Sequence, residues 1–252
     1  MFIQFDGLVW FTVTLLPLVF LQRLLHREIQ SVLLIVSRSP EVTVTVFSII
    51  FLPGVLLHEF SHYVMAVILG VQAARFSLIP QTLPDGRLQL GYVETEKTDI
   101  IRDSLIGAAP LFAGGSLVAF LSVTRLDLLP LWAVLQNAQL NLVWLGITLL
   151  PQVKDFPLWF YLMFTISSTM LPSGSDRHAW LPLGVAMAIL LALAVVAGAG
   201  PWMLEFMAPI LNTFLRTSAV IFGLSVILHA VLIIPTGLMH FLLTRITGVD
   251  IA

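Results

Sequence analysis

The stretch LPGVLLHEFSHYVMAVILG, from Leu52 to Gly70, places two histidines and a glutamate inside a run that is otherwise mostly apolar or small. A helix that crosses the hydrocarbon core of a bilayer needs about 20 mostly apolar residues. Ionisable side chains inside such a helix are unfavourable and mark functional sites. We therefore expect His58, Glu59 and His62 to serve a function within the membrane.

The composition of the whole chain predicts the same environment. Of its 252 residues, 58% are apolar and only 10% are charged, against about a quarter charged in soluble domains. A soluble fold of this length could not bury so much apolar surface. The chain is expected to be a multi-pass integral membrane protein in contact with the lipid bilayer. Its net charge of −2 does not favour a nucleic acid partner, and the absence of cysteine excludes disulfides and thiolate metal sites.

The apolar segments predict an all-α polytopic fold with six or seven transmembrane helices in a single transmembrane domain over residues 1–252. The segment 156–172 is long enough for only part of a crossing, and the amides of 131–150 are expected to face other helices or a wet cavity. The candidate spans are 7–22, 42–70, 105–124, 131–150, 156–172, 178–199 and 217–244.

The longest loop between these spans contains a predicted β-hairpin near residues 81–94. Its sequence, QTLPDGRLQLGYVE, has a Pro-Asp-Gly turn followed by the alternation of Leu88, Leu90 and Tyr92. A turn of this type beside a period of two is typical of a hairpin.

Residues His58 to His62 match the pattern H-E-x-x-H. On a helix the two histidines are one turn apart, about 40° around the axis, so both imidazoles can reach one ion. Two imidazoles and an oxygen ligand suit Zn²⁺, with a fourth position left for water. Glu59 is rotated away from the histidine edge, and we expect it to be the catalytic base. The alternative is a cluster of polar residues that hydrogen-bond to neighbouring helices.

A third metal ligand must come from another part of the chain, and Asp176 is the first candidate. It follows a helix break at Pro172 and Gly174, and unwound backbone at membrane depth must be buried in protein or line a cavity. An ordinary solvated loop is the alternative, and His178 competes for the same role. His229 and His240 lie eleven residues apart, and interhelical hydrogen bonding explains them better than a second polar site.

These motifs resemble the site-2 protease family of intramembrane zinc metalloproteases, in a divergent form without a PDZ or CBS domain. LLHEFSHYVMAVILGV resembles the catalytic helix of that family, and RDSLIGAAPLFAGG resembles the small-residue segment that opens its next core helix. SSTMLPSGSD is similar to the element that carries the third zinc ligand. The resemblance implies a protease-like core over about 42–200, flanked by an extra N-terminal span and a C-terminal span.

The resemblance implies zinc ligation by His58, His62 and Asp176, with Glu59 as the base. Ser168 stands near an asparagine that helps to hold the substrate strand in the family, and the hairpin edge with Leu90 and Tyr92 is expected to receive that strand. The expected function is hydrolysis of a peptide bond in or near a transmembrane segment of a membrane-protein substrate, in the cell membrane of a prokaryote. The alternative is a non-catalytic zinc-binding membrane scaffold or transporter.

Overall fold

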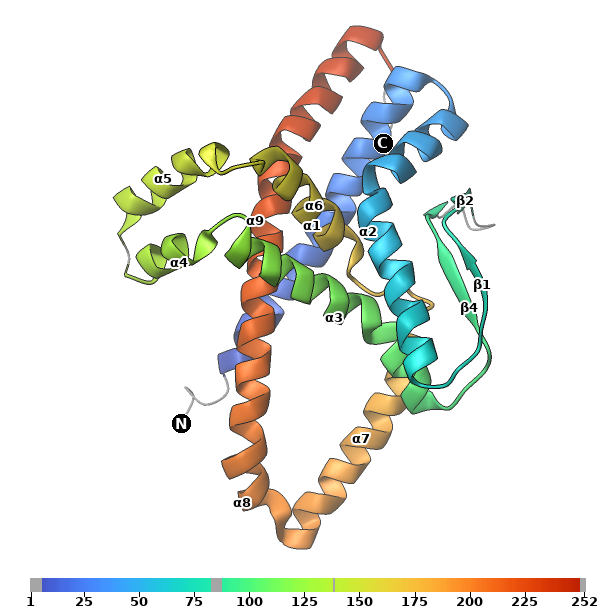
Figure 1. Ribbon diagram of the computed structural model, residues 1–252, viewed down its shortest axis with the longest axis vertical. Coiled ribbons are helices and arrows are strands. Elements are labelled where there is room, and N and C mark those ends of the chain that lie inside the picture. Colours follow the sequence, from blue (N-terminus) through green and yellow to red (C-terminus); the bar gives the residue numbers. More distant parts are fainter. Residues whose placement is uncertain (1–5, 83–87, 138, 250–252) are drawn as a thin grey trace.

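The computed structural model of the chain describes residues 6–82, 88–137 and 139–249, and most of these residues are helical (Figure 1). Within them, four helical segments are long and apolar enough to cross a membrane: Asp6–Ser37, Pro40–Ile68, Ile100–Thr124 and Trp180–Thr247. The expectation of a helical membrane protein with a small hairpin is confirmed at this level.

Two long helices, α1 (Asp6–Ser37) and α9 (Ala208–Thr247), lie side by side along most of their length (Figure 1). At one end of the pair Asp6 forms an ion pair with Arg216, and towards the other end Glu28 contacts His240. The helix α1 continues well beyond the predicted span 7–22 to include most of the polar stretch expected to separate two spans. The first two helices are therefore joined by only a short turn.

The helix α2 (Pro40–Ile68) begins where the hydroxyl of Ser39 accepts a hydrogen bond from the backbone N–H of Val42. Proline at the first helical position lacks the N–H that would otherwise remain unsatisfied. Similarly, α3 (Ile100–Thr124) begins at Asp99, whose carboxylate accepts from two backbone N–H groups of the first turn. Short polar caps at both starts explain why these apolar helices begin at defined residues.

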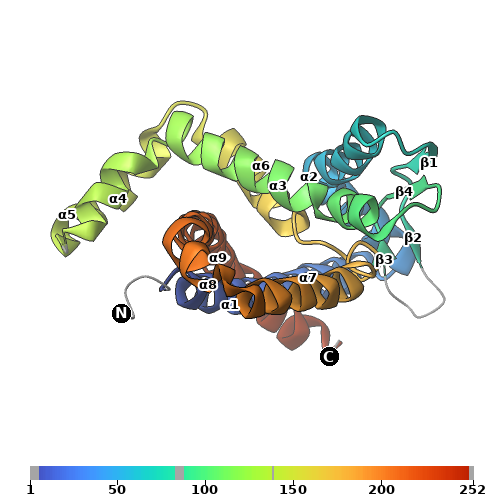
Figure 2. The ribbon, with the colours of Figure 1, turned by 90° about the horizontal axis from the view of Figure 1, so that it is seen from below.

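Viewed from below, the helices form two layers (Figure 2). One layer holds α1, α9 and α7 (Trp180–Ala194), and the other holds α2 and α3. The short helix α6 (Phe156–Thr169) contacts α2, α3 and α9. Its C-terminal end lies where the two layers meet, because Ser168 bonds to His229 of α9 and Thr169 to His58 of α2.

The predicted span 131–150 is not one helix. The chain instead forms α4 (Leu128–Gln136) and α5 (Leu140–Leu149), two short helices that contact one another as a helical hairpin (Figures 1 and 2). Each is about 14 Å long, half of the hydrocarbon thickness, so neither crosses a bilayer alone. The cluster of amide residues over 136–141 coincides with the reversal between them.

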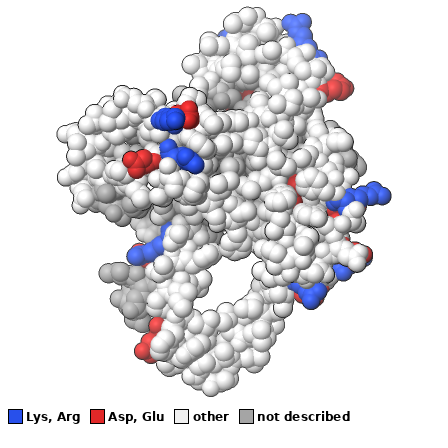
Figure 3. Space-filling view, viewed as in Figure 1, with Lys and Arg blue, Asp and Glu red and all other residues white. Residues whose placement is uncertain are grey.

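The helices α7 and α9 are the two arms of a V (Figure 1). Two π-helical turns, Val195–Ala199 and Met203–Met207, and the short α8 (Gly200–Trp202) join the arms. Gly198 adopts a φ of 88°, a left-handed conformation that glycine adopts without steric penalty, and the chain changes direction there. No residue of α7 is buried, and Figure 3 shows an opening between the arms.

The polar loop after α2 forms a longer hairpin than the one predicted for 81–94. The strands β1 (Ala73–Ser77) and β4 (Tyr92–Thr95) pair antiparallel, with Ser77 opposite Tyr92. Beyond them, β2 (Gln81–Thr82) pairs with β3 (Leu88–Gln89). The predicted Pro-Asp-Gly turn, residues 84–86, lies outside the described residues.

The outer surface of the protein is largely apolar, as a lipid environment requires. Leu181, Val196 and Ile246 are each more than three-quarters exposed. Charged residues are sparse on the face shown in Figure 3 and leave a broad uncharged area. The buried core, in contrast, contains an aromatic group formed by Phe47, Phe51 and Phe164.

Close packing of α2 on α6 depends on Gly54. A Cβ atom at this position would collide with the backbone carbonyl of Thr165 and with the hydroxyl of Thr169. Because the obstacle includes backbone, a side chain at residue 54 would have to move the helices apart. Gly54 thus sets the distance between the helix that carries His58 and the helix whose end lies beside it.

We predict that Gly54→Ala destabilises the protein by about 1–3 kcal/mol through overpacking, measured by thermal unfolding in detergent micelles. Gly237→Ala is the matched control, because an added Cβ at residue 237 of α9 meets nothing within 4 Å. The free energy of unfolding of this control variant should be unchanged or higher by up to about 1 kcal/mol, because alanine has a higher helix propensity than glycine. Equal melting temperatures for the two variants would contradict the close contact.

Candidate metal centre

Three potential metal ligands from two segments converge in the structure. The Nε2 atoms of His58 and His62 on α2 are 3.2 Å apart. Asp176, from the loop between α6 and α7, places its Oδ2 3.5 Å from His58 Nε2 and its Oδ1 3.4 Å from His62 Nε2. Among the described residues this is the one group of three His, Cys, Asp or Glu that could hold a metal ion.

The separation of the two histidine nitrogens is close to that of two ligands on a tetrahedral ion. Ligand atoms about 2.0–2.2 Å from zinc at tetrahedral angles lie about 3.3–3.6 Å from one another. The two Nε2 atoms, 3.2 Å apart, are close to this range, and each lies 3.4–3.5 Å from a different oxygen of Asp176. With one ligand atom from each residue, all three atoms lie within 4.8 Å of one another. Three protein ligands leave one tetrahedral position for water or substrate, as in catalytic zinc sites.

The outer nitrogen of each imidazole contacts a backbone carbonyl. His58 Nδ1 lies 2.6 Å from the carbonyl oxygen of Thr169, and His62 Nδ1 lies 2.8 Å from that of Ile106. A carbonyl only accepts, so each Nδ1 must carry a proton, and in its neutral form each ring presents an Nε2 lone pair. Two lone pairs and a carboxylate therefore face one point, an arrangement that a cation stabilises. Metal-ligating histidines commonly have such an outer partner.

Proline explains why the carbonyl of Ile106 can accept from His62. In a helix that oxygen would accept the N–H of the residue four positions later, which here is Pro110, a residue without an N–H. The Pro110 ring is fully buried within α3. The gap that proline leaves in the helical ladder thus provides the hydrogen-bond partner of a metal ligand.

The loop that carries Asp176 holds the carboxylate in a local turn. The backbone N–H of Ser173 donates to Asp176 Oδ2 at 2.6 Å, and the backbone N–H of Asp176 donates to the Ser173 hydroxyl at 3.3 Å. On the other side, a Cβ at Gly107 of α3 would collide with the backbone carbonyl of Asp176. Glycine at residue 107 therefore allows the loop to lie directly against α3.

Glu59 follows His58 on α2 and is not one of the three converging ligands. It is 7% exposed and lies beneath the β-hairpin, where a Cβ at Gly91 would lie only 2.9 Å from Glu59 Cγ. The neighbouring residue Val55 lies against the same glycine. The hairpin backbone thus covers the side of α2 that carries the predicted base.

The competing ligand His178 lies outside the ligand group. Its Nε2 is 2.7 Å from Asp103 on α3, and its Nδ1 is 2.6 Å from the carbonyl of Ser175. The side chain is 67% exposed. The structure therefore favours Asp176 as the third ligand, and His178 instead links the loop to α3.

His229 and His240, considered above as a second polar site, have separate partners. His229 is fully buried and its Nε2 is 2.9 Å from the hydroxyl of Ser168 on α6. His240 Nδ1 lies 2.6 Å from Glu28 on α1. Each histidine thus has one interhelical partner.

The predicted substrate-binding residues lie at different depths. Ser168 is 1% exposed and its hydroxyl bonds to His229 inside the helical bundle. Leu90 is partly buried against the core, and Tyr92 is partly buried in β4. Contact of these three residues with a substrate stays a prediction.

Sequence reasoning missed the backbone groups that orient the histidines. The carbonyls of Ile106 and Thr169 have no residue-type signature. The proline four residues after Ile106 is a signal for the first, whereas Thr169 loses its helical partner because the N–H of Ser173 bonds to Asp176. In the sequence, Gly107 stands out only as part of a small-residue segment. Its close contact with Asp176 depends on the fold.

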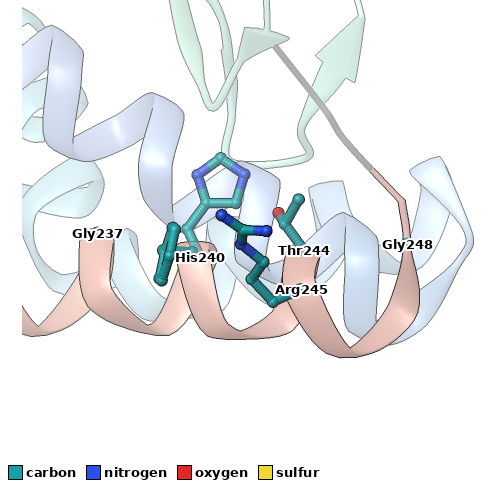
Figure 4. A pocket seen from close by; sticks show the side chains of 6 residues that line it. Gly237, His240, Thr244, Arg245 and Gly248 are labelled. Atoms are coloured by element: carbon teal, nitrogen blue, oxygen red, sulfur yellow. The ribbon is translucent and has the colours of Figure 1, made fainter.

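A surface pocket lies away from the metal centre, at the C-terminal end of α9 (Figure 4). The side chain of His240 lies beside those of Arg245 and Thr244 in this view. The lining residues are Gly237, His240, Phe241, Thr244, Arg245 and Gly248. None of the three converging ligands lines this pocket.

Comparison of the chain with protein-family models, with curated proteins and with solved structures finds no match.

We predict that Asp176→Ala weakens zinc binding by at least about 100-fold, since it removes a direct ligand and outer partners alone contribute about 10–100-fold. His178→Ala, its neighbour on the same loop, should bind zinc nearly as well as the wild type. Zinc affinity is measured by competition with a chelating dye on purified protein. If His178→Ala bound zinc more weakly than Asp176→Ala, Asp176 would be excluded as the third ligand.

We predict that Pro110→Ala weakens zinc binding by about 10-fold, within the range for lost outer partners. Alanine supplies an N–H that bonds the carbonyl of Ile106 and draws it away from His62. Pro235→Ala, at the proline within α9, is the control and should leave zinc affinity unchanged. Wild-type affinity in Pro110→Ala would show that His62 does not depend on this freed carbonyl.

Proposed function

We propose that this chain is an intramembrane zinc metalloprotease that hydrolyses a peptide bond in or near a transmembrane segment of a membrane-protein substrate. The observation that supports this most directly is the convergence of His58, His62 and Asp176 within metal-binding distance, with Glu59 next to a ligand in an apolar helix. The resemblance of the motifs to the site-2 protease family agrees with this function.

The residues of the chain divide the chemistry among them. A zinc ion held by His58, His62 and Asp176 would supply Lewis acidity that activates water and polarises the scissile carbonyl. Glu59 accepts a proton as the water oxygen bonds to the carbonyl carbon. It then gives that proton to the amine nitrogen as the C–N bond breaks.

The depth of the site suggests where the substrate is cleaved. His62 lies about 9 Å along the helix axis from the end of α2 at Ile68. Ser173, Ser175 and His178 are exposed polar residues of the loop that carries Asp176. A site near one membrane boundary with a polar loop beside it gives water a short path and favours cleavage close to that boundary.

The hairpin beside Glu59 offers a place for an unwound substrate segment. Within the described residues β1 pairs only with β4, so each strand has one edge without a strand partner. A substrate helix must unwind before its carbonyls can be attacked, and a strand edge supplies the lost backbone partners. We propose that the substrate adds to this hairpin near Leu90 and Tyr92. Ser168 contributes to substrate binding from its position on α6.

The membrane arrangement proposed with this function has six crossings. They are α1, α2, α3, α7, α9 and, as the sixth, α6 together with the loop that follows it, because α6 alone is shorter than the hydrocarbon core. The α4–α5 hairpin enters and leaves on one side. The location proposed is the cell membrane of a prokaryote.

We predict that Glu59→Gln keeps zinc and lowers cleavage of single-span reporter proteins in lipid vesicles by about 10²–10⁴-fold, the usual contribution of a general base. Glutamine preserves the size of the side chain that packs under Gly91 but cannot accept the proton. Cleavage is followed by gel mobility of the products and zinc by elemental analysis.

One outcome would contradict the role of Glu59, and another the proposed activity. Cleavage at the wild-type rate by Glu59→Gln would exclude this residue as the base. A wild-type protein that binds one zinc ion and cleaves no reporter would instead support a zinc-binding membrane scaffold or transporter.

A further inference from the structure

The last turn of α6 has two carbonyls without helical partners. The oxygen of Ser168 would accept the N–H of residue 172, which is Pro172 and has none. The oxygen of Thr169 would accept from Ser173, whose N–H instead bonds to Asp176. Two other helices satisfy these oxygens, because Gln22 Nε2 of α1 donates to Ser168 at 2.5 Å and His58 Nδ1 of α2 donates to Thr169 at 2.6 Å.

His229 of α9 holds the same turn from the other layer. Its Nδ1 lies 2.7 Å from the carbonyl of Ser225, so that nitrogen carries the proton and Nε2 is an acceptor. The hydroxyl of Ser168 donates to Nε2 at 2.9 Å. Both residues are essentially inaccessible, at 0% and 1% exposure.

We propose that His229 is a positioning residue for the metal centre. Through Ser168 it fixes the end of α6, so that the carbonyl of the next residue, Thr169, holds His58 with Nε2 towards the ion. This inference rests on the metal-binding part of the proposed function and is independent of hydrolysis.

The geometry explains why this contact reaches the metal site rather than merely joining two helices. Ser168 and Thr169 are adjacent, and the same turn leads directly through Pro172 to Asp176. A shift of this turn would displace the carbonyl that orients one ligand and the loop that carries another. An unsatisfied imidazole in an apolar bundle is unfavourable, and this one has a bond to Ser168 that no apolar residue at 229 could replace.

The test uses full-length purified protein and measures zinc affinity by chelator competition, together with the visible spectrum of the Co²⁺-loaded form. We expect His229→Ala and Ser168→Ala each to weaken zinc binding by about 10-fold, the lower end for outer partners. The double variant should lose no more than either single one, because both substitutions break one hydrogen bond. His229→Gln, whose amide oxygen can accept from Ser168, should recover most of the affinity.

A matched control separates positioning from packing. Ser122 on α3 is also a buried serine, but its hydroxyl bonds within its own helix to Val118. Ser122→Ala should therefore leave zinc affinity and the Co²⁺ spectrum unchanged. Thermal unfolding of the metal-free proteins shows how much each substitution destabilises the fold.

Two results would overturn the role of His229. One is wild-type zinc affinity in Ser168→Ala, which removes a single oxygen and serves if His229→Ala fails to fold. The other is additive losses in the double variant. A wild-type protein that binds no zinc would refute both this role and the proposed protease. A protein that binds zinc but cleaves nothing would refute only hydrolysis, and the affinity series would still decide the role of His229.

Discussion

The metal centre depends on how the backbone is satisfied where helices are interrupted. In an apolar environment each free carbonyl needs a partner within the protein. Pro110 and Pro172 remove N–H donors from α3 and from the extension of α6, and the carbonyls that helical bonds do not use accept from His62, His58 and Gln22. The interruptions that would weaken these helices are thus the source of the contacts that orient the histidines. The same contacts therefore pack the helices and set the geometry of the metal site.

Close contacts at glycine bring the three segments near enough for these bonds. Gly54 allows α2 to meet α6, and Gly107 allows the loop with Asp176 to meet α3. Small residues at interfaces are the usual means of close helix approach in membranes, where lipid provides no strong hydrophobic drive for association. The ligand group is therefore held by backbone proximity on both sides of α2, while α1 and α9 support the α6 turn from the second layer.

The sequence predicted best what lies within one helix. His58, Glu59 and His62 have a fixed relation on α2 once the helix is recognised, and Pro172 and Gly174 marked the break that carries Asp176. Composition could not separate a crossing helix from the α4–α5 hairpin, because both are equally apolar and only the amides near Asn137 indicate a reversal. The partner of Ser168 could not be predicted, since His229 is 61 residues away and the pairing exists only after α9 packs on α6.

Because the ligands come from two separate segments, metal binding is expected to stabilise the fold. Two ligands lie on α2 and the third on the loop after α6, so an ion bound by all three joins α2 to that loop. A ligand set that exists only in the folded arrangement makes the free energy of metal binding part of the free energy of folding. The contacts at Thr169 and Ile106 reduce the ordering that binding requires, because both imidazoles already present Nε2 to the same point. Metal binding and the packing of α2 against α3 and α6 should therefore stabilise one another.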